Sequence, residues 1–475
     1  MSKTVKPCYN VLMEIKILDP VYSLITDKRY IPEISKLLSF EAEFWQKISI
    51  KDKYGVPTGK FKKERRTYKK SIVMPSGMFY TGFVPKIEQY LQGKGLQVSV
   101  LQQNWPYLTR SPQIPLVLRP DQEKLVSNAV SSRRGIIKSP TGAGKTVIAS
   151  ALITSFKDIK TIFLCHRVSL VHQTVKEFER FGMNVGYLTG TNQKLTGDVI
   201  VSTIQTFHKM GQELFDTFDM VIVDEVHRFA KGSTTKKEGG YYFKTLTKLI
   251  APLRYGLTAT LPTNEETKLL VEGLIGPLID EFSLKEGIDQ GILAMPKIKI
   301  IKIPIDYKVK ELRRYADVYD QGIVNNRSRN RMIIKTAKDL ATEGKTSLIL
   351  ITKIEHGENL VTTANLLNHK VCFIQGKDDG EIREQVRESL NNKDIKTVIA
   401  TNIWGEGTNI PSLNCLIIAG GGKSEIALLQ SIGRGLRATD EKDSVLIVDF
   451  LDISHHYLIS HFGERLIVFA DNGWL

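Results

Sequence analysis

A glycine-rich segment, SPTGAGKT at residues 139–146, has the composition of a phosphate-binding loop. It follows the strand-like run GIIK and precedes the helical run VIASALI, which is the context such a loop requires. Glycines let backbone N–H groups approach phosphate oxygens, and the following helix N-terminus adds positive potential. The pattern predicts that Lys145 reaches the β- and γ-phosphates and that the Thr146 hydroxyl ligates Mg²⁺. The expected nucleotide-binding residues here are Thr141, Gly142, Ala143, Gly144, Lys145 and Thr146. Ser139 stands where the strict pattern has glycine, and an ordinary glycine-rich turn is the alternative.

An acidic pair, Asp224 and Glu225, ends the apolar run MVIVDE. Carboxylates at the carboxyl end of a parallel strand lie where such sheets present ligands. We expect Asp224 to hold Mg²⁺ partly through water and Glu225 to take a proton from an attacking water. A solvated strand end is the alternative, and the preceding phosphate loop favours the functional interpretation.

Two arginines, Arg434 and Arg437, lie three residues apart in QSIGRGLR and share one helical face. A guanidinium is planar, permanently charged and bidentate, so it suits stabilisation of a γ-phosphate. An isolated pair of this kind would more simply be a solvated basic helix. Because a phosphate loop and an acidic pair precede them in the chain, we expect both arginines to be catalytic.

Positive charge is concentrated near the N-terminus. The chain has 66 Lys+Arg and 51 Asp+Glu, a net charge of +15, and residues 1–110 contribute 19 basic and 9 acidic side chains, or +10. Such a surplus indicates a polyanionic partner, most often nucleic acid. Within residues 51–70 there are nine basic and two acidic side chains. This basic run is either a solvated hairpin or a phosphate grip, and the residues expected to contact DNA are Lys62, Lys63, Arg65 and Arg66.

The elements that must position these residues follow an α/β alternation. From about residue 114, short apolar runs such as TIFLCH and DMVIVDE alternate with helical patterns, and a second series begins near Lys345. Residues 284–335, which include the basic stretch 327–331, are expected to join the two series. The sequence therefore predicts two tandem parallel-sheet domains.

The first 110 residues have different, strand-rich patterning that predicts a small α+β domain. Residues 9–18 alternate with period two, and residues 66–84 predict a hairpin around Pro75-Ser76-Gly77. Residues 85–95 predict a short helix that ends at Gly93 or Gly95.

Composition excludes several protein classes. The apolar fraction is 42% and the charged fraction 25%, as in an average globular chain. No run of about 18 uncharged apolar residues predicts a membrane span, and the first thirty residues do not resemble a signal peptide. The four cysteines, none in a C-x-x-C pair, are expected to be reduced and mostly buried, which indicates a cytoplasmic protein. They are Cys8, Cys165, Cys372 and Cys415.

The motifs SPTGAGKT, DEVH and QSIGRGLR resemble the Walker A, Walker B and arginine-finger motifs of superfamily 2 helicases. Further segments resemble that superfamily's motifs in their usual order: LRPDQ, LCHRVSLVHQ, VSTIQTF, TAT, LITKIEHGENL and ATNIWGEGTNIP. The resemblance spans roughly residues 115–440. One departure is Asn409, which occupies a position often held by aspartate.

The resemblance implies roles for further residues. The expected nucleotide contacts are Arg119, Gln122, Gly407 and Gln430, with Gln122 reading the adenine. The expected coupling residues are His227, Thr258 and Thr260. The expected DNA contacts of the motor are His166, Arg167, Thr203, Thr352, Lys353 and Thr401.

The chain is most similar to phage UvsW-type branch-migration helicases, which are related to RecG-like translocases. This resemblance implies a monomeric motor that uses ATP and Mg²⁺ and acts on branched, duplex and single-stranded DNA in recombination, repair or replication. If a phage encodes the chain, its place is the host cytoplasm. The implied domains are a basic DNA-binding domain at 1–112, a RecA-like domain at 113–283, and a linker, second RecA-like domain and helical tail at 284–475.

Three other functions remain open from the sequence. The core motifs are shared with DExH RNA helicases, and a 2′-hydroxyl contact cannot be recognised from a motif. A duplex translocase that does not unwind would use the same motor. A non-enzymatic, ATP-gated clamp is disfavoured because it would have no need of Glu225, Thr146 and Arg437.

Overall fold

The computed structural model describes residues 12–51, 57–101, 107–190, 192–230, 238–401, 410, 412–422 and 444–475. The chain forms two compact units. Unit 1 comprises residues 1–138 and 146–281, and unit 2 comprises residues 139–145 and 282–475. Among the described helices, none is long and apolar enough to cross a membrane.

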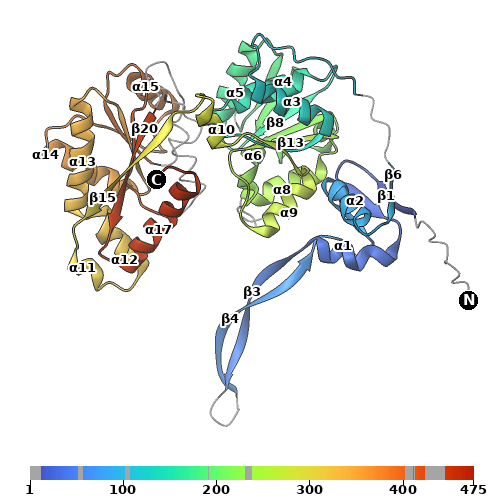
Figure 1. Ribbon diagram of the computed structural model, residues 1–475, viewed down its shortest axis with the longest axis horizontal. Coiled ribbons are helices and arrows are strands. Elements are labelled where there is room, and N and C mark those ends of the chain that lie inside the picture. The colour runs from blue at the N-terminus through green and yellow to red at the C-terminus, as the bar shows by residue number, and fades with distance from the viewer. Residues whose placement is uncertain are drawn as a thin grey trace, which may run out of the picture. The chain divides into compact units, whose positions relative to one another are not determined.

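The N-terminal part of unit 1 is a small α+β domain (Figure 1). Its four-stranded sheet has the order β5-β2-β1-β6, in which β6 pairs parallel to β1 and the other pairs are antiparallel. The elements are β1 (Leu12–Ile17), β2 (Tyr22–Ile25), η1 (Lys28–Tyr30), α1 (Ile31–Leu37), β5 (Met78–Tyr80), η2 (Thr81–Phe83), α2 (Val84–Gln92) and β6 (Gln97–Leu101). β1 confirms the strand predicted within residues 9–18, and α2 confirms the helix predicted to end at Gly93.

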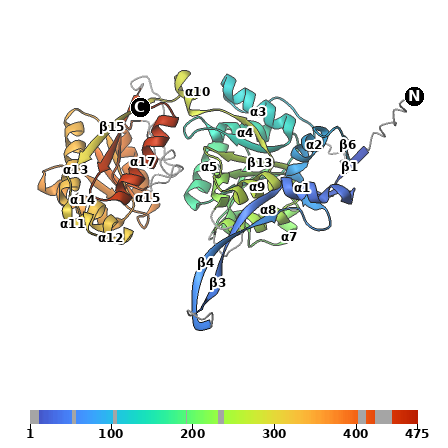
Figure 2. The ribbon, with the colours of Figure 1, turned by 60° about the horizontal axis from the view of Figure 1, so that its bottom comes forward.

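Two long strands, β3 (Ser39–Lys51) and β4 (Pro57–Ser71), form a separate antiparallel ribbon. Figures 1 and 2 show this ribbon as an arm that leaves the body of unit 1 near α1. The hairpin predicted over residues 66–84 is wrong. A turn does form there, with a hydrogen bond from Gly77 N to Met74 O of 2.9 Å, but the flanking strands pair elsewhere. β4 pairs with β3 and β5 pairs with β2, because long-range partners outcompete the local one.

The rest of unit 1 is built on an eight-stranded sheet in the order β10-β9-β11-β8-β12-β13-β7-β14. Every pair is parallel except β10 with β9. The strands are β7 (Arg134–Lys138), β8 (Thr161–Cys165), β9 (Val185–Leu188), β10 (Gln193–Lys194), β11 (Val199–Thr203), β12 (Met220–Asp224), β13 (Leu253–Thr258) and β14 (Leu278–Glu281). The central strands are buried on both faces, which explains their continuous apolar runs.

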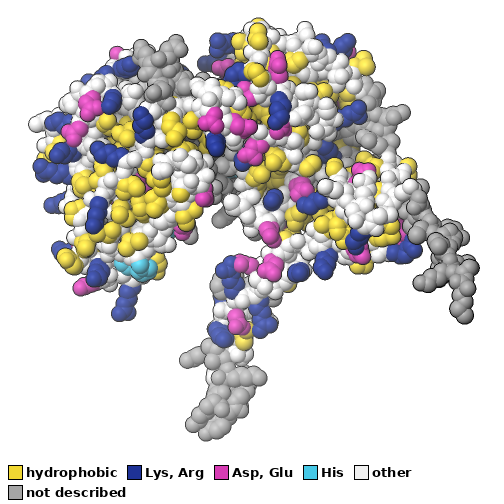
Figure 3. Space-filling view, in the orientation of Figure 1, with side chains coloured by type: hydrophobic (Ala, Val, Ile, Leu, Met, Phe, Trp, Pro, Cys, Tyr) yellow, Lys and Arg dark blue, Asp and Glu magenta, His cyan; other side chains and the backbone are white. Residues whose placement is uncertain are grey.

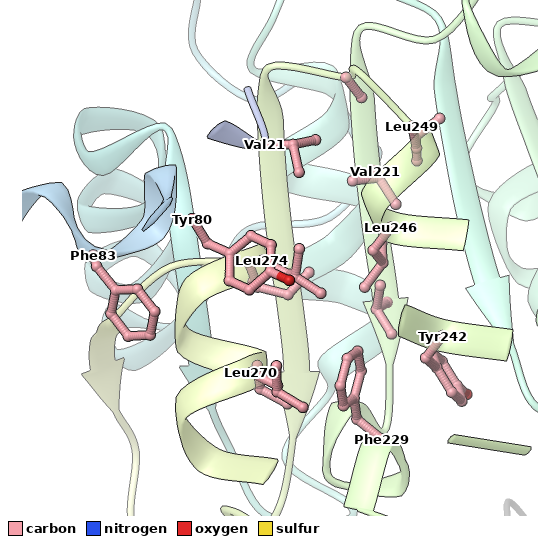
Figure 4. Close-up of a cluster of buried hydrophobic side chains, with 14 of the residues drawn as sticks. Val21, Tyr80, Phe83, Val221, Phe229, Tyr242, Leu246, Leu249, Leu270 and Leu274 are labelled. Atoms are coloured by element: carbon pink, nitrogen blue, oxygen red, sulfur yellow. The ribbon is translucent and has the colours of Figure 1, made fainter. Parts of the chain in front are cut away.

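Helices cover both faces of this sheet. α3 (Pro120–Ser132), α4 (Lys145–Thr154) and α5 (Val168–Arg180) lie on one side in Figure 1. α6 (Ile204–Phe207), α8 (Glu238–Lys248) and α9 (Glu265–Leu274) pack against the other side, and the short α7 (Gln212–Phe215) and η3 (Val226–Ala230) complete it. This second face shares a continuous hydrophobic core with the N-terminal domain, from Met13 to Ile275 (Figure 4).

Unit 2 contains a six-stranded, fully parallel sheet in the order β15-β20-β19-β16-β18-β17. The strands are β15 (Met295–Ile303), β16 (Ser347–Ile351), β17 (Cys372–Ile374), β18 (Thr397–Thr401), β19 (Cys415–Ile418) and β20 (Ser444–Asp452). α15 (Gly380–Asn391) and α17 (His456–Asp471) pack on one face, and α13 (Arg327–Thr342) and α14 (Ile354–Leu366) on the other. The other helices among the described residues of this unit are α10 (Leu284–Asp289), α11 (Tyr307–Lys310), α12 (Tyr315–Tyr319) and the π-helix η4 (Asp320–Val324).

The predicted fold class is thus confirmed: two RecA-like parallel-sheet domains preceded by a small α+β domain. Part of the segment expected to join the domains, residues 295–303, instead forms β15 at the edge of the second sheet. Within the expected basic stretch, Arg329 is fully buried and bonds Asp452 at 3.0 Å. Cys165, Cys372 and Cys415 are free thiols, and Cys8 lies outside the described residues.

Candidate functional site

The glycine-rich loop connects β7 to α4, as the sequence predicted. Gly142 and Gly144 have φ angles of 92° and 94°, a region that residues with a Cβ rarely adopt. The Ala143 N–H donates to Pro140 O at 3.3 Å, and Lys145 Nζ is 3.5 Å from Ser139 O. The lysine therefore folds back over the loop from the first turn of α4, where a bound phosphate would be neutralised.

The loop has the features that a nucleotide phosphate needs. Both left-handed glycines turn the backbone tightly at the start of a ten-residue helix. The Ser139 hydroxyl is buried and has no hydrogen-bond partner in the part of the chain that the structure describes. The serine that stands here in place of the glycine of the strict pattern therefore carries a buried hydroxyl that no described residue satisfies.

A magnesium ion would need few protein ligands here. The described residues contain no group of three or more His, Cys, Asp or Glu side chains that could hold a metal. Mg²⁺ usually keeps several waters and binds one or two protein oxygens together with substrate phosphates. Thr146 and Asp224 are compatible with such a site.

The acidic pair lies at the carboxyl end of β12, whose residues Met220 to Val223 are buried. Glu225 has a φ of 50°, so its backbone is in the left-handed region, which costs about 1–3 kcal/mol for a non-glycine residue. Its Oε2 lies 3.2 Å from His227 Nδ1. Burial, and then the charge of Asp224, raises the pKa of the Cys165 thiol on the adjacent strand β8 well above its usual value.

Hydrogen bonds join His227 to the two threonines of the TAT segment. His227 Nδ1 is 3.0 Å from Thr258 Oγ1. The Thr258 hydroxyl donates to Thr260 O at 2.6 Å, so its oxygen must accept from the histidine. Nδ1 therefore carries the proton and faces both the Glu225 carboxylate and the Thr258 hydroxyl. The three expected coupling residues lie in one connected network.

The expected adenine-reading residues lie at the start of α3. Gln122 is buried, and its Oε1 accepts a hydrogen bond from Arg119 N at 3.2 Å. The Arg119 guanidinium makes two 2.9 Å bonds to the buried Asp121 carboxylate. The sequence did not single out Asp121, although an acidic residue between Arg and Gln in the first helical turn is a signal for such a pair.

The expected DNA contacts of unit 1 lie at the carboxyl edge of the same sheet. His166 and Arg167 follow β8, and Thr203 ends β11, the neighbouring strand. Thr203 is buried, and its hydroxyl accepts from Thr206 N at 3.2 Å, which caps α6. Its side chain has a structural use that the sequence did not predict.

In unit 2, the expected contacts lie at the carboxyl edge of the second sheet. Thr352 and Lys353 follow β16, and Thr401 ends the adjacent strand β18. Lys353 forms an ion pair with Asp320 and lies 5.6 Å from the ring centroid of Tyr319. Neither partner was predicted, because Tyr319 ends α12 and Asp320 begins η4, both about 30 residues before Lys353 in the sequence. Gly407, Gln430, Arg434 and Arg437, together with Asn409, lie outside the described residues.

The basic run lies on the β3–β4 ribbon, where Lys62, Lys63, Arg65 and Arg66 are all exposed. Figure 3 shows Lys and Arg side chains along the described part of this arm. Arg65 forms an ion pair with Glu43, and Arg66 lies 3.7 Å from Glu64. Phe61 and Tyr68 are 64% and 49% exposed, so aromatic rings interleave with the cations.

Comparisons with known proteins agree with this geometry. The family described as "Type III restriction enzyme, res subunit" matches residues 115–263, and "Helicase conserved C-terminal domain" matches residues 329–439. The chain is 24% identical over 385 residues to the ATP-dependent DNA helicase uvsW of Enterobacteria phage T4, with 74% of each chain covered. It is also 24% identical over 368 residues to the DNA 3'-5' translocase XPB2 of Sulfurisphaera tokodaii, with 70% of this chain and 80% of the relative covered.

A solved structure shares the fold. The ATP-dependent Type ISP restriction-modification enzyme LlaBIII bound to DNA matches with a TM-score of 0.58 at 16% identity, over 82% of this chain and 32% of that chain. The two matched families cover the glycine-rich loop, the acidic pair and most of the second sheet. The chain therefore belongs to the superfamily 2 helicases and is an ATP-dependent enzyme of that family.

Proposed function

We propose that this enzyme is an ATP-driven DNA motor that unwinds forks and junctions and moves branch points, in recombination, repair or replication. The observation that carries the proposal is the exposed, basic β3–β4 arm beside a superfamily 2 motor domain. A two-stranded β-ribbon has dimensions that fit a groove of duplex DNA. Its cations would contact phosphates, which position DNA without reading its sequence.

Each residue of the proposed nucleotide site would contact a different part of ATP or its metal ion. The backbone of residues 141–144 and the Lys145 ammonium bind the phosphates, while Gln122 and Arg119 contact the base. Thr146 and Asp224 would hold Mg²⁺, which supplies charge neutralisation on the phosphate oxygens. Glu225 orients the attacking water and accepts its proton, since its carboxylate is held toward His227.

Coupling of ATP hydrolysis to DNA movement would depend on the interactions of His227. His227 Nδ1 lies near both the Glu225 carboxylate and the Thr258 hydroxyl. A change in the charge of Glu225 would therefore alter the hydrogen bond between His227 and Thr258. Thr258 in turn fixes the backbone at Thr260. Arg434, Arg437, Gly407 and Gln430 are proposed as further nucleotide contacts, as the family resemblance implies.

We infer three domains with boundaries at 1–112, 113–283 and 284–475, acting as a monomer. The proposal places the enzyme in the cytoplasm, in the host cell if a phage encodes it. Lys62, Lys63, Arg65 and Arg66 would hold duplex DNA. The motor would contact one strand through His166, Arg167, Thr203, Thr352, Lys353 and Thr401.

A second candidate, a duplex translocase that does not separate strands, is favoured by the similarity to XPB2, whose name describes a translocase. Both functions need the same ATP site and the same grip on duplex DNA. They differ only in whether single strands are released.

The test compares five substrates of matched length: single-stranded DNA, blunt duplex, a fork, a four-way junction, and a fork made of RNA. ATP hydrolysis, strand release and displacement of a duplex-bound roadblock are measured on each. We expect the fork and junction to give strand release and the RNA fork to give none. Roadblock displacement without strand release would favour the translocase, and preferential release of RNA would overturn the proposal.

Lys145→Ala is the control for the motor. It should bind the same DNA but abolish hydrolysis and strand release, since the phosphates lose their cation. Hydrolysis within about tenfold of the parent would contradict the assignment of the nucleotide site.

A further inference from the structure

Helix α9 contacts both the coupling segment and the N-terminal domain. It begins shortly after Thr260, with Asn264 capping its first turn at 3.1 Å from Thr267 N. Leu270, Val271 and Leu274 of α9 are buried in the core cluster that also contains Phe229, which follows the DEVH segment. Figure 4 shows Leu270 and Leu274 between Phe229 on one side and Tyr80 and Phe83 of the N-terminal domain on the other.

The two backbones approach too closely for any side chain at the contact. A Cβ on Gly82 would lie 2.1 Å from Glu272 O and 2.5 Å from Gly273 O. A Cβ on Gly273 would lie 2.7 Å from the Phe83 ring. Glycine at both positions therefore permits η2 to dock directly on α9.

Polar contacts surround this apolar seam. Lys86 Nζ lies 3.2 Å and 3.0 Å from the two carboxylate oxygens of Glu272. Lys70, at the base of the basic arm, lies 3.7 Å from Glu266 on the first turn of α9. The Arg134 guanidinium bonds Pro20 O at 3.0 Å, Leu274 O at 3.2 Å and Ile275 O at 2.9 Å, so it fastens the end of α9 to the N-terminal domain.

We propose that α9 fixes the N-terminal domain, and with it the base of the basic arm, against the network of Glu225, His227 and Thr258, with Gly82, Gly273, Lys86 and Glu272 as positioning residues. The proposal rests on the proposed function, in which the arm grips duplex DNA. It adds that the base of the arm is fixed on α9. Duplex held by the arm has a fixed place relative to Glu225, His227 and Thr258, so hydrolysis is converted into strand separation.

This arrangement predicts a loss of coupling with little loss of binding. Gly82→Ala forces backbone atoms apart and loosens the docking, while the cations of the arm and the nucleotide loop are untouched. We expect fork strands released per ATP hydrolysed to fall about tenfold, a change of about 1.4 kcal/mol. Fork affinity and ATPase stimulated by single-stranded DNA should stay within about twofold of the parent. Gly380→Ala is the matched control, because apart from its own chain neighbours no atom lies within 4 Å of an added Cβ.

A charge swap provides the second test if Gly82→Ala folds poorly. Lys86→Glu and Glu272→Lys singly place like charges together and should each reduce strands released per ATP. The double variant restores the pair in reverse and should recover most of the coupling. The inference would be overturned if the single variants release as many strands per ATP as the parent. It would also be overturned if their loss of strand release follows a loss of fork affinity or melting temperature and the double variant does not restore it. If the parent itself releases no strands, the proposed function fails instead.

Discussion

Glu225 has a left-handed backbone, with a φ of 50°, directly after strand β12, and its Oε2 lies 3.2 Å from His227 Nδ1. Replacing Glu225 with Gln keeps the shape of the side chain but removes its ability to accept a proton. We expect nucleotide binding within about threefold of the parent and a single-turnover rate at least about 100-fold lower. Equilibrium binding and quenched-flow hydrolysis measure the two steps separately. Lost binding with unchanged chemistry would contradict the role.

His356 on α14 provides a titratable group in the core of unit 2. Its Nε2 donates to Asn330 Oδ1 at 3.0 Å, because the Asn330 amide nitrogen donates to Val324 O. Burial, with a contribution from Arg329, lowers the pKa of His356 to about 3. As pH falls below about 6.5, His356 becomes protonated in the unfolded chain but stays neutral in the folded chain. The free energy of unfolding therefore decreases.

The expected loss from His356 is about 2 kcal/mol between pH 7 and pH 5. His356→Gln removes the titrating group, and the dependence of the unfolding free energy on pH should become shallower by that amount. Urea denaturation at both pH values measures it. A parent and variant with the same pH dependence would show that His356 is protonated without cost.

At the scale of elements, the β3–β4 ribbon is exposed along most of its described length, so a hydrophobic core contributes little to it. Its cations are arranged by strand alternation: Lys62 and Arg66 share one face, while Lys63 and Arg65 share the other. Replacing all four with Gln should weaken fork binding and reduce its salt dependence. Each lost phosphate contact lowers the log–log slope by about 0.9.

The ribbon prediction is checked by fluorescence anisotropy from low to moderate salt. The control is Lys297→Gln with Lys299→Gln, which removes two exposed lysines from the edge strand β15 of the other unit. An unchanged slope in the quadruple variant would mean that the arm is only a solvated surface. Lys86 and Lys94 are poorly placed to hold DNA phosphates in place of the arm, since they form ion pairs with Glu272 and Glu33.

At the scale of the whole molecule, the N-terminal domain cannot be removed cleanly. Its side chains Tyr80, Phe83 and Val84 belong to the core cluster that covers α9. Burial of a large apolar side chain is worth about 1.5–3 kcal/mol, so a truncation that begins at residue 107 exposes a costly surface. We expect the truncated protein to melt at least about 5 °C lower and to aggregate. A truncated protein as stable as the parent would show that the shared core contributes little.

The sequence by itself determined the two parallel sheets and the local chemistry. The Gly-Lys-Thr loop, the acidic pair after β12 and the apolar strands follow from nearest-neighbour patterns, because loop geometry and strand burial depend mainly on local residue types. The tertiary structure decided what depends on long-range partners. It paired β4 with β3 instead of β5, buried Arg329 against Asp452, and placed Glu225 Oε2 and Thr258 Oγ1 3.2 Å and 3.0 Å from one ring nitrogen of His227. It also docked η2 on α9, because only a folded core brings Gly82 and Gly273 together.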